Sequence, residues 1–169
     1  MVFAVESNIK VDMNGFKSLL NNLKEASKTV AVSGVINADE NATEAAVLNE
    51  FGGTGIYTRG PYVGQSVDVP PRPFVKSAIE HHADEIIKVA EDSLDLEEDP
   101  NLTKVLRAMG KKTAELQEDA LYSNGEGIQG WQKHNSPRTI ETKNGLDKPL
   151  FTEHGTTFPI DYELQRRSA

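Results

Sequence analysis

The sequence predicts an α+β protein in which a small mixed sheet packs against two long helices, with an extended loop and a C-terminal arm. Three observations lead to this fold class. Apolar residues recur at helical spacing in two long segments, residues 73–94 and 101–121. Residues 29–36 are rich in β-branched side chains, which is typical of a strand. Residues 52–73 contain several glycines and prolines, which predicts an extended loop.

The length and composition indicate one folded unit. The chain has 169 residues, of which 37% are hydrophobic and 26% are charged. A chain of this size can form one domain with a moderate core. We expect residues 1–150 to form a single α+β domain and residues 151–169 to form an arm or a short hairpin.

The charge and the absence of cysteine exclude several classes of function. With no cysteine, the chain has no disulfide, thiolate metal site or thiol nucleophile. The net charge is −8, and the sequence lacks the clustered Lys and Arg that a sequence-independent grip on DNA requires. An acidic surface remains compatible with DNA that slides past without binding.

Neither a membrane span nor an export signal is predicted. No segment approaches the run of about 20 apolar residues that crosses a bilayer. The first residues lack the basic flank and the long apolar stretch of a signal peptide. We therefore expect a soluble protein that is made in a cytoplasm and has no membrane partner.

The amino-terminal third predicts a strand, a helix and a second strand. Residues 9–13 alternate in polarity, as a strand does. Asn14 is a candidate N-cap for an amphipathic helix that extends to about Ala26. The second strand is the β-branched run at 29–36. The apolar side chains of the helix are Phe16, Leu19, Leu20 and Leu23.

A short helix and a long loop follow. Asn41 or Thr43 could cap the helix, which we expect to stop at Gly52-Gly53. In the loop, aromatic and apolar residues on both sides of Gly60-Pro61 suggest a hairpin that turns there. Loops of this length are often functional.

Two longer helices are expected next. Pro73 is suited to the first turn of a helix that continues to about Leu94. An acidic run then ends at Pro100, and Asn101 can cap a further helix that ends near Asn124-Gly125. No long periodic element is predicted after that point, although residues 151–164 could contain a short strand or hairpin.

The titratable residues do not form a persuasive catalytic or metal site. His81 and His82 are neighbours on a helix and diverge by roughly 100°, so they cannot easily share one metal. The acids of residues 84–99 lie in a run with few apolar neighbours, which favours a solvated face over a catalytic pair. An acidic channel lining is the alternative for that run. We predict no catalytic residue, no cofactor and no bound metal.

Glycine and serine motifs are equally weak. Gly52-Gly53-Thr54-Gly55 resembles part of a phosphate-binding loop, but it follows a helix and lacks a subsequent Lys-Ser/Thr pair. No Gly-x-Ser-x-Gly nucleophile turn is present. Trp131, the single tryptophan, and Phe74 are more suited to packing in a core or at an interface than to binding a ligand.

Four short motifs occur in a fixed order. They are Leu48-Asn49-Glu50-Phe51-Gly52, Val69-Pro70-Pro71-Arg72-Pro73-Phe74-Val75, Gly130-Trp131-Gln132 with Asn135-Ser136-Pro137-Arg138-Thr139-Ile140, and Lys143 with Leu146-Asp147-Lys148-Pro149-Leu150. Together they resemble the phage virion-morphogenesis and tail-completion family, which includes the neck proteins similar to gene product ten of phage HK97. The resemblance covers roughly residues 44–150 and ends after Leu150, where the family usually continues with Asp-Thr-Gly-x-Leu.

This resemblance implies a non-enzymatic α+β subunit of a tailed phage. Such subunits form a ring, commonly a hexamer, between the portal-proximal adaptors and the tail tube. The resemblance thus implies a head–tail connector, or neck, protein with homo-oligomeric, adaptor and tail-tube partners, through which DNA passes without specific binding. A ring of twelve subunits is the alternative to the hexamer. The expected packing or interface residues are Phe51, Arg72, Pro73, Phe74 and Trp131.

The expected mode of action is the completion of interfaces. The loop at 52–73 and the tail after Leu150 would dock against neighbouring subunits, and Arg72 would pair with a carboxylate, either across an interface or within the chain. Two other functions remain open. One is another minor tail or capsid-associated protein. The other is a small cytoplasmic enzyme or binding domain, which should have a pocket with clustered polar groups.

Overall fold

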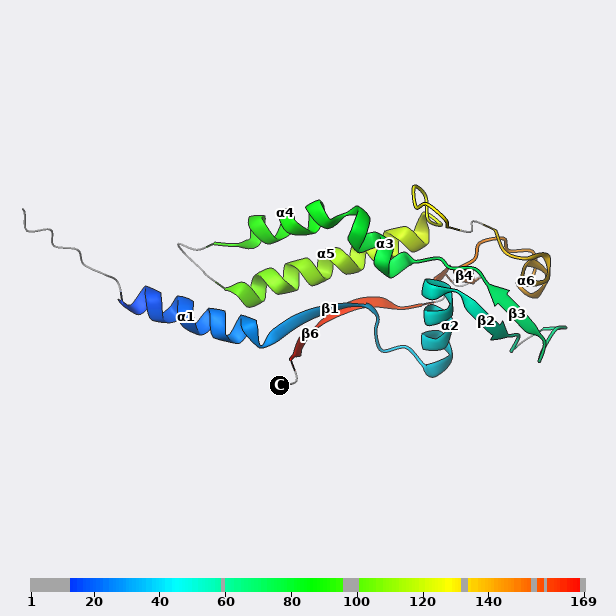
Figure 1. The fold of residues 1–169 in the computed structure, drawn as a ribbon, viewed down its shortest axis with the longest axis horizontal. Coiled ribbons are helices and arrows are strands. Elements are labelled where there is room, and N and C mark those ends of the chain that lie inside the picture. The colour runs from blue at the N-terminus through cyan, green and yellow to red at the C-terminus, as the bar shows by residue number, and fades with distance from the viewer. Residues whose placement is uncertain are drawn as a thin grey trace, which may run out of the picture.

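The computed structural model describes residues 13–58, 60–95, 101–131, 134–152, 155–156 and 158–167. Figure 1 shows an elongated molecule with a layer of helices lying along a long two-stranded ribbon. One end carries a projecting helix, and the other carries a short helix, a hairpin and the loops around them. The α+β class is confirmed.

The first described element is helix α1, Met13–Ser27. It matches the predicted amphipathic helix, but Asn14 lies inside it and does not cap it. The strand expected at 9–13 falls largely outside the described residues, and Met13 already belongs to the helix. α1 contacts α5 and β1 near its carboxyl end and projects beyond the rest of the molecule (Figure 1).

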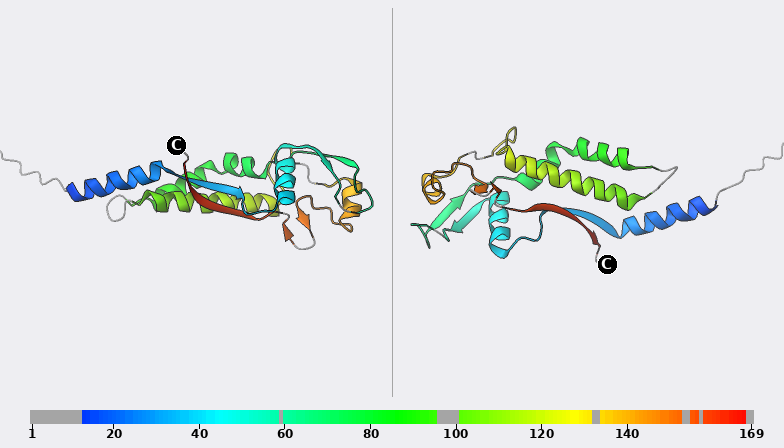
Figure 2. Two further views of the ribbon diagram at one scale, coloured as in Figure 1. Left: turned by 90° about the horizontal axis from the view of Figure 1, so that it is seen from below. Right: turned by 180° about the vertical axis from the view of Figure 1, so that it is seen from behind.

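A long antiparallel ribbon forms the backbone of the fold. Strand β1, Thr29–Val35, confirms the predicted strand and pairs along its whole length with β6, Ile160–Arg166. Figure 2 shows this ribbon running along α5. Gly110 of α5 permits the close approach, because a Cβ there would lie 2.8 Å from Cδ2 of Tyr162. The segment expected to be an arm or short hairpin therefore includes a strand that packs on the central helix.

Helix α2, Glu40–Phe51, and a hairpin form the opposite end of the molecule. The N-cap is Asp39, whose side chain accepts a hydrogen bond from the Ala42 amide, so the predicted caps Asn41 and Thr43 are wrong. The helix ends at Gly52 as predicted. The hairpin in the following loop is also observed, with strands β2, Gly53–Ile56, and β3, Ser66–Val69.

The long helix predicted from Pro73 is in fact two helices. They are α3, Phe74–His81, and α4, Ala83–Ser93, with a break at His82. Both pack against α5, Leu102–Tyr122, and the break lets each keep that contact. α5 agrees with the prediction, including its cap: the Asn101 side chain accepts a hydrogen bond from the Lys104 amide.

The remaining elements are short. Helix α6, Pro137–Thr142, was not predicted, and β4, Phe151–Thr152, pairs with β5, Gly155–Thr156. The strands of the described residues form three separate two-stranded antiparallel pairs, so the expectation of one mixed sheet needs correction. β2–β3 and β4–β5 join strands close in sequence, which favours antiparallel hairpins.

The main core lies where the helical layer meets the hairpin end. Phe74 is 1% exposed and stacks on Phe158 with ring centroids 5.7 Å apart. Leu121, Trp131 and Leu150 complete the buried apolar cluster. Full burial of side chains this large contributes roughly 1.5–3 kcal/mol each, so this cluster is the main source of stability at that end.

Candidate functional site

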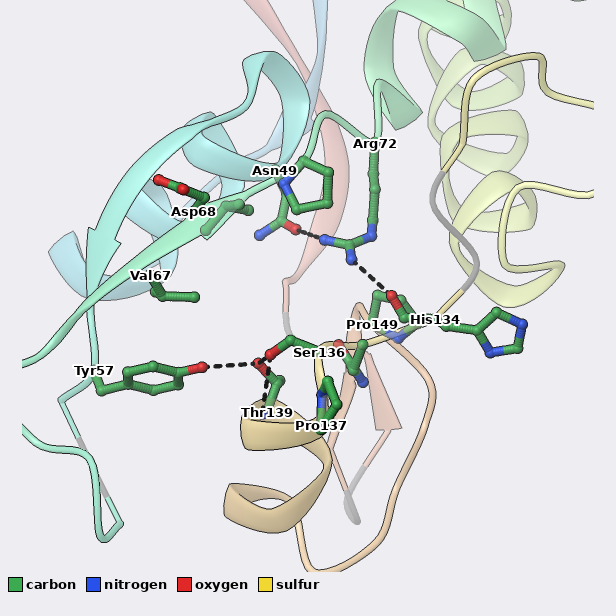
Figure 3. Close-up of a pocket in the computed structure, with 13 residues that line it drawn as sticks. Asn49, Tyr57, Val67, Asp68, Arg72, His134, Ser136, Pro137, Thr139 and Pro149 are labelled. Carbon is green, nitrogen blue, oxygen red and sulfur yellow. Dashed lines mark hydrogen bonds between the residues drawn. The ribbon is translucent and has the colours of Figure 1, made fainter.

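The four ordered motifs converge on one junction at the hairpin end of the molecule. Figure 3 shows side chains from α2, from β3 and the loop after it, and from the segment before α6 facing one cleft. The cleft has a volume of about 460 Å³, and Asn49, Arg72, Ser136 and Pro149 are among its lining residues. Segments that are distant in sequence therefore form a single structural unit.

Arg72 is the centre of this junction. The residue is 5% exposed. Its guanidinium donates Nη1–H to Asn49 Oδ1 at 2.9 Å and Nη2–H to the carbonyl of His134 at 3.4 Å (Figure 3). Its amide donates to the Asn49 carbonyl. Burial lowers the pKa of Arg72 from its ordinary value. Arg72 thus joins the first two motifs to each other and to His134, which lies between the two parts of the third, through hydrogen bonds within one chain.

Glu50 links the first motif to the second by capping a helix. Pro73 occupies the N-cap position of α3 and supplies no side-chain cap. The Glu50 carboxylate accepts hydrogen bonds from the amides of Val75 and Lys76, each at 2.9 Å. A negative charge at a helix amino end is favourable, because the first amides have no partner within the helix. Glu50 therefore fixes α2 against α3.

Asp147 organises the loop that precedes α6. Its carboxylate accepts a hydrogen bond from the Asn135 amide at 2.7 Å, and its other oxygen lies 2.7 Å from Nδ1 of His134. The Asn135 amide, and secondarily His134, lower the pKa of Asp147. Ser136 then caps α6 by accepting from the Thr139 amide. The third and fourth motifs are thereby held together.

The side chain of Lys143 holds the same loop together through hydrogen bonds to its backbone. Its Nζ donates to the carbonyls of Lys148, Pro149 and Phe151, at 3.1, 2.5 and 2.8 Å. The three N–H donors of an ammonium match these three acceptors. Burial, with a smaller effect from the Arg72 charge, lowers the pKa of Lys143 to about 8.

The indole of Trp131 packs on the backbone of Gly125. A Cβ at Gly125 would lie 2.0 Å from Cδ2 of the indole, and the residue has a positive φ of 68°. Trp131 is 7% exposed and donates Nε1–H to Asn124 Oδ1 at 3.2 Å. The turn that ends α5 and the third motif therefore depend on each other.

Sequence reasoning missed the contact between the β2–β3 hairpin and α6. The Tyr57 hydroxyl lies 3.2 Å from Oγ1 of Thr139, and Tyr62 donates to Glu141 at 2.7 Å. The Arg138 guanidinium lies 5.2 Å from the centre of the Tyr62 ring. The only signals were two tyrosines in a polar loop and a Ser-Pro pair 15 residues or so before Leu150.

The other predicted packing or interface residues separate into two groups. Arg72, Phe74 and Trp131 are buried within this chain, and Pro73 is half-buried beside them. Phe51 is 76% exposed at the end of α2. Among the five, Phe51 alone leaves a large apolar side chain exposed.

The residues considered for metal or phosphate binding take part in ion pairs or in strand pairing. Nδ1 of His82 lies 2.6 Å from Glu85, which also pairs with Lys112 at 2.9 Å. Gly53 and Gly55 belong to the β2–β3 ladder. Within the described ranges, no group of three His, Asp or Glu side chains could hold a metal ion. His154 and residues 96–99 of the acidic run lie outside the described residues.

Two further findings bear on the class of protein. In the part of the chain that the structure describes, no helix is long and apolar enough to cross a membrane. Comparisons with protein-family models, with curated proteins and with solved structures gave no match.

Proposed function

We propose that the chain is a non-catalytic structural protein of a tailed phage, a ring-forming head–tail connector or tail-completion subunit. The proposal rests on one observation above all: the four motifs that carry the family resemblance meet around Arg72. Motifs matched by chance would have no reason to bond to one another. Here each supplies a donor, an acceptor or a cap to another, so they act as one unit of structure.

The distribution of apolar surface supports a role in assembly. Large apolar side chains are exposed at both ends of the elongated molecule, on α1 and on α2 with the following hairpin, and a few more are exposed on the helices between them. Contiguous exposed apolar surface marks interaction sites in soluble proteins. A ring subunit needs such surface on two different sides, because each copy contacts two neighbours.

The decisive experiment is electron microscopy of particles from the phage that encodes this chain, made with and without it. A connector subunit predicts filled heads and complete tails that remain separate, and joining should return when the intact gene is supplied in trans. Normally joined particles made without the chain would refute the proposal. A defect confined to the tail or capsid, with joining intact, would favour another minor tail or capsid-associated protein.

A cytoplasmic enzyme or binding domain is the third candidate. The cleft at the junction has the size of a small-molecule site, since such sites begin at about 300 Å³. Its polar groups, however, are largely bonded to one another: Arg72 to Asn49, and Tyr57 to Thr139. If loss of the chain leaves particle assembly unaffected, the enzyme or binding-domain function would be favoured, with this cleft as its site.

A further inference from the structure

We propose that α1 of one copy docks in a groove between α2 and the β2–β3 hairpin of a second copy, so that copies associate head to tail. This inference deepens the proposed ring and rests on it. It assigns the two surfaces that meet. It also predicts that the contact is heterologous, with different patches on the two partners.

The first surface is an apolar stripe on α1, formed by Phe16, Leu20 and Leu23. These side chains are 53%, 39% and 47% exposed. They occupy positions i, i+4 and i+7 of the helix, so they lie along one face. A helix that presents this spacing to a groove is a recurring mode of recognition between proteins. α1 projects past the end of α5, and among the described residues no element covers that stripe (Figure 1).

The second surface is the α2–β2 groove, which is lined on its apolar side by Val47, Leu48, Ile56, Val67 and Val69. Its volume is about 880 Å³, compared with about 460 Å³ for the cleft at the junction. Val47 and Ile56, which line the groove, are 52% and 66% exposed, so their apolar surface is available to a partner. The space and its lining match a row of large apolar side chains.

The charges around the two surfaces are complementary. α1 carries Lys17 and Lys24, both exposed, on the helix that bears the apolar stripe. The groove is bordered by Glu44, and Glu40 lies one turn earlier on α2. α2 contains no Lys or Arg. Opposite charges at the rim of an apolar contact set orientation and disfavour contacts between two identical ends.

The occupant of the groove must be a second molecule. α1 and the α2–β2 groove lie at opposite ends of the elongated chain (Figures 1 and 2), so α1 cannot reach its own groove. When one patch binds a different patch on the next copy, the assembly propagates. It closes into a ring if the rotation between copies permits, and otherwise forms a filament.

Because the natural chain has no cysteine, single engineered cysteines report this contact cleanly. The full chain carrying Leu20→Cys is mixed with the full chain carrying Val47→Cys, and a short flexible bis-maleimide is added. A flexible linker is used because a direct disulfide needs Cα atoms within about 7 Å. The control replaces the second partner with Ile87→Cys, an equally exposed position on α4.

The expected result is a covalent dimer in the Leu20→Cys and Val47→Cys mixture, at least about tenfold more than in the Ile87→Cys control, which corresponds to roughly 1.4 kcal/mol of preference. A chain with both substitutions should give a ladder of larger products. Reversing the charges with Lys17→Glu and Lys24→Glu should reduce the yield, and adding Glu40→Lys and Glu44→Lys should restore it.

Two results would overturn the inference. Rapid dimers of Leu20→Cys alone would show that α1 contacts α1. Equal yields with Val47→Cys and Ile87→Cys would show that the groove is not the partner of α1. In either case, light scattering of the unmodified chain and the particle experiment still test the ring separately. A ring without this cross-link would refute only the interface, whereas joined particles in the absence of the chain would refute the proposed function.

Discussion

Arg72 and Asn49 are joined twice, once through side chains and once through the backbone. Nη1 of Arg72 donates to Oδ1 of Asn49, and the Arg72 amide donates to the Asn49 carbonyl. The first bond depends on the fork of the guanidinium, which reaches Asn49 and the His134 carbonyl together. The end of α2 and the start of α3 are therefore fixed relative to each other by a single buried residue.

Replacement of Arg72 by lysine should destabilise this junction. A lysine ammonium cannot span both acceptors, so Arg72→Lys leaves one partly buried acceptor unpaired and should lower the free energy of unfolding by about 1–2 kcal/mol. Denaturant unfolding followed by circular dichroism measures the change. Arg107→Lys, at an exposed position on α5, is the matched control and should change stability by less than about 0.5 kcal/mol. Equal effects of the two substitutions would contradict this role.

Glu50 offers a second test, through its cap on α3. Glu50→Ala removes the acceptors of the Val75 and Lys76 amides and should cost about 1–2 kcal/mol of stability. Glu50→Gln keeps one acceptor oxygen and should lose less. Glu118→Ala, an exposed position within α5, controls for the loss of a carboxylate from a helix surface. Hydrogen exchange of the α3 amides, which Glu50→Ala should accelerate, localises the effect.

The contact between Gly125 and Trp131 can be separated from backbone strain by two alanine substitutions. Gly127→Ala places a Cβ at a φ of 79° in open space and should cost about 1–2 kcal/mol. Gly125→Ala combines a similar φ with a collision against the indole and should cost at least about 3 kcal/mol. Because Trp131 is the single tryptophan, its fluorescence reports directly on this site. Equal costs would mean that the indole moves aside freely.

The lowered pKa of Lys143 predicts a dependence of stability on alkaline pH. The unfolded chain holds this proton up to about pH 10.5, whereas the folded chain releases it near pH 8. Since the unfolded state binds more protons between these values, the free energy of unfolding should rise there with pH. The cost of keeping Lys143 charged in the folded chain is thus fully present below about pH 8, falls as the pH rises, and is gone above about pH 10.5.

Lys143→Met provides the comparison for this pH effect. The variant has no titrating group at this position, so the rise between pH 8 and 10.5 should be smaller in its stability profile than in that of the natural chain. It also leaves three carbonyls without their donor, which should lower its stability at pH 7. Parallel profiles for the two proteins would contradict the assigned pKa.

Local sequence signals predicted most of the elements but few of the contacts between them. α5 was predictable because Asn101 and a regular apolar stripe both act within one helix. The break at His82 was not, because no Gly or Pro marks it and it depends on packing of α3 and α4 against α5. α6 was missed because six residues are too few to show a period.

The junction itself was only partly predictable. The motifs indicated which residues matter, and Arg72, Phe74 and Trp131 do lie together at one end of the fold. Their partners were not apparent, because Asn49, Glu50 and Asp147 are brought to them by chain folding rather than by spacing in sequence. The same holds for the C-terminal strand, whose polar alternation gave no hint of its partner β1.

The pairing of β1 with β6 has a consequence for how the chain is made. β1 ends at Val35 and β6 begins at Ile160, so nearly the whole chain must leave the ribosome before the ribbon can form. Contacts between such distant segments require closure of a long loop, which slows folding. Until then both edges of β1 are unpaired, and an unpaired edge invites pairing with other chains. The protein should therefore need its C-terminal strand in place before it can accumulate safely at high concentration.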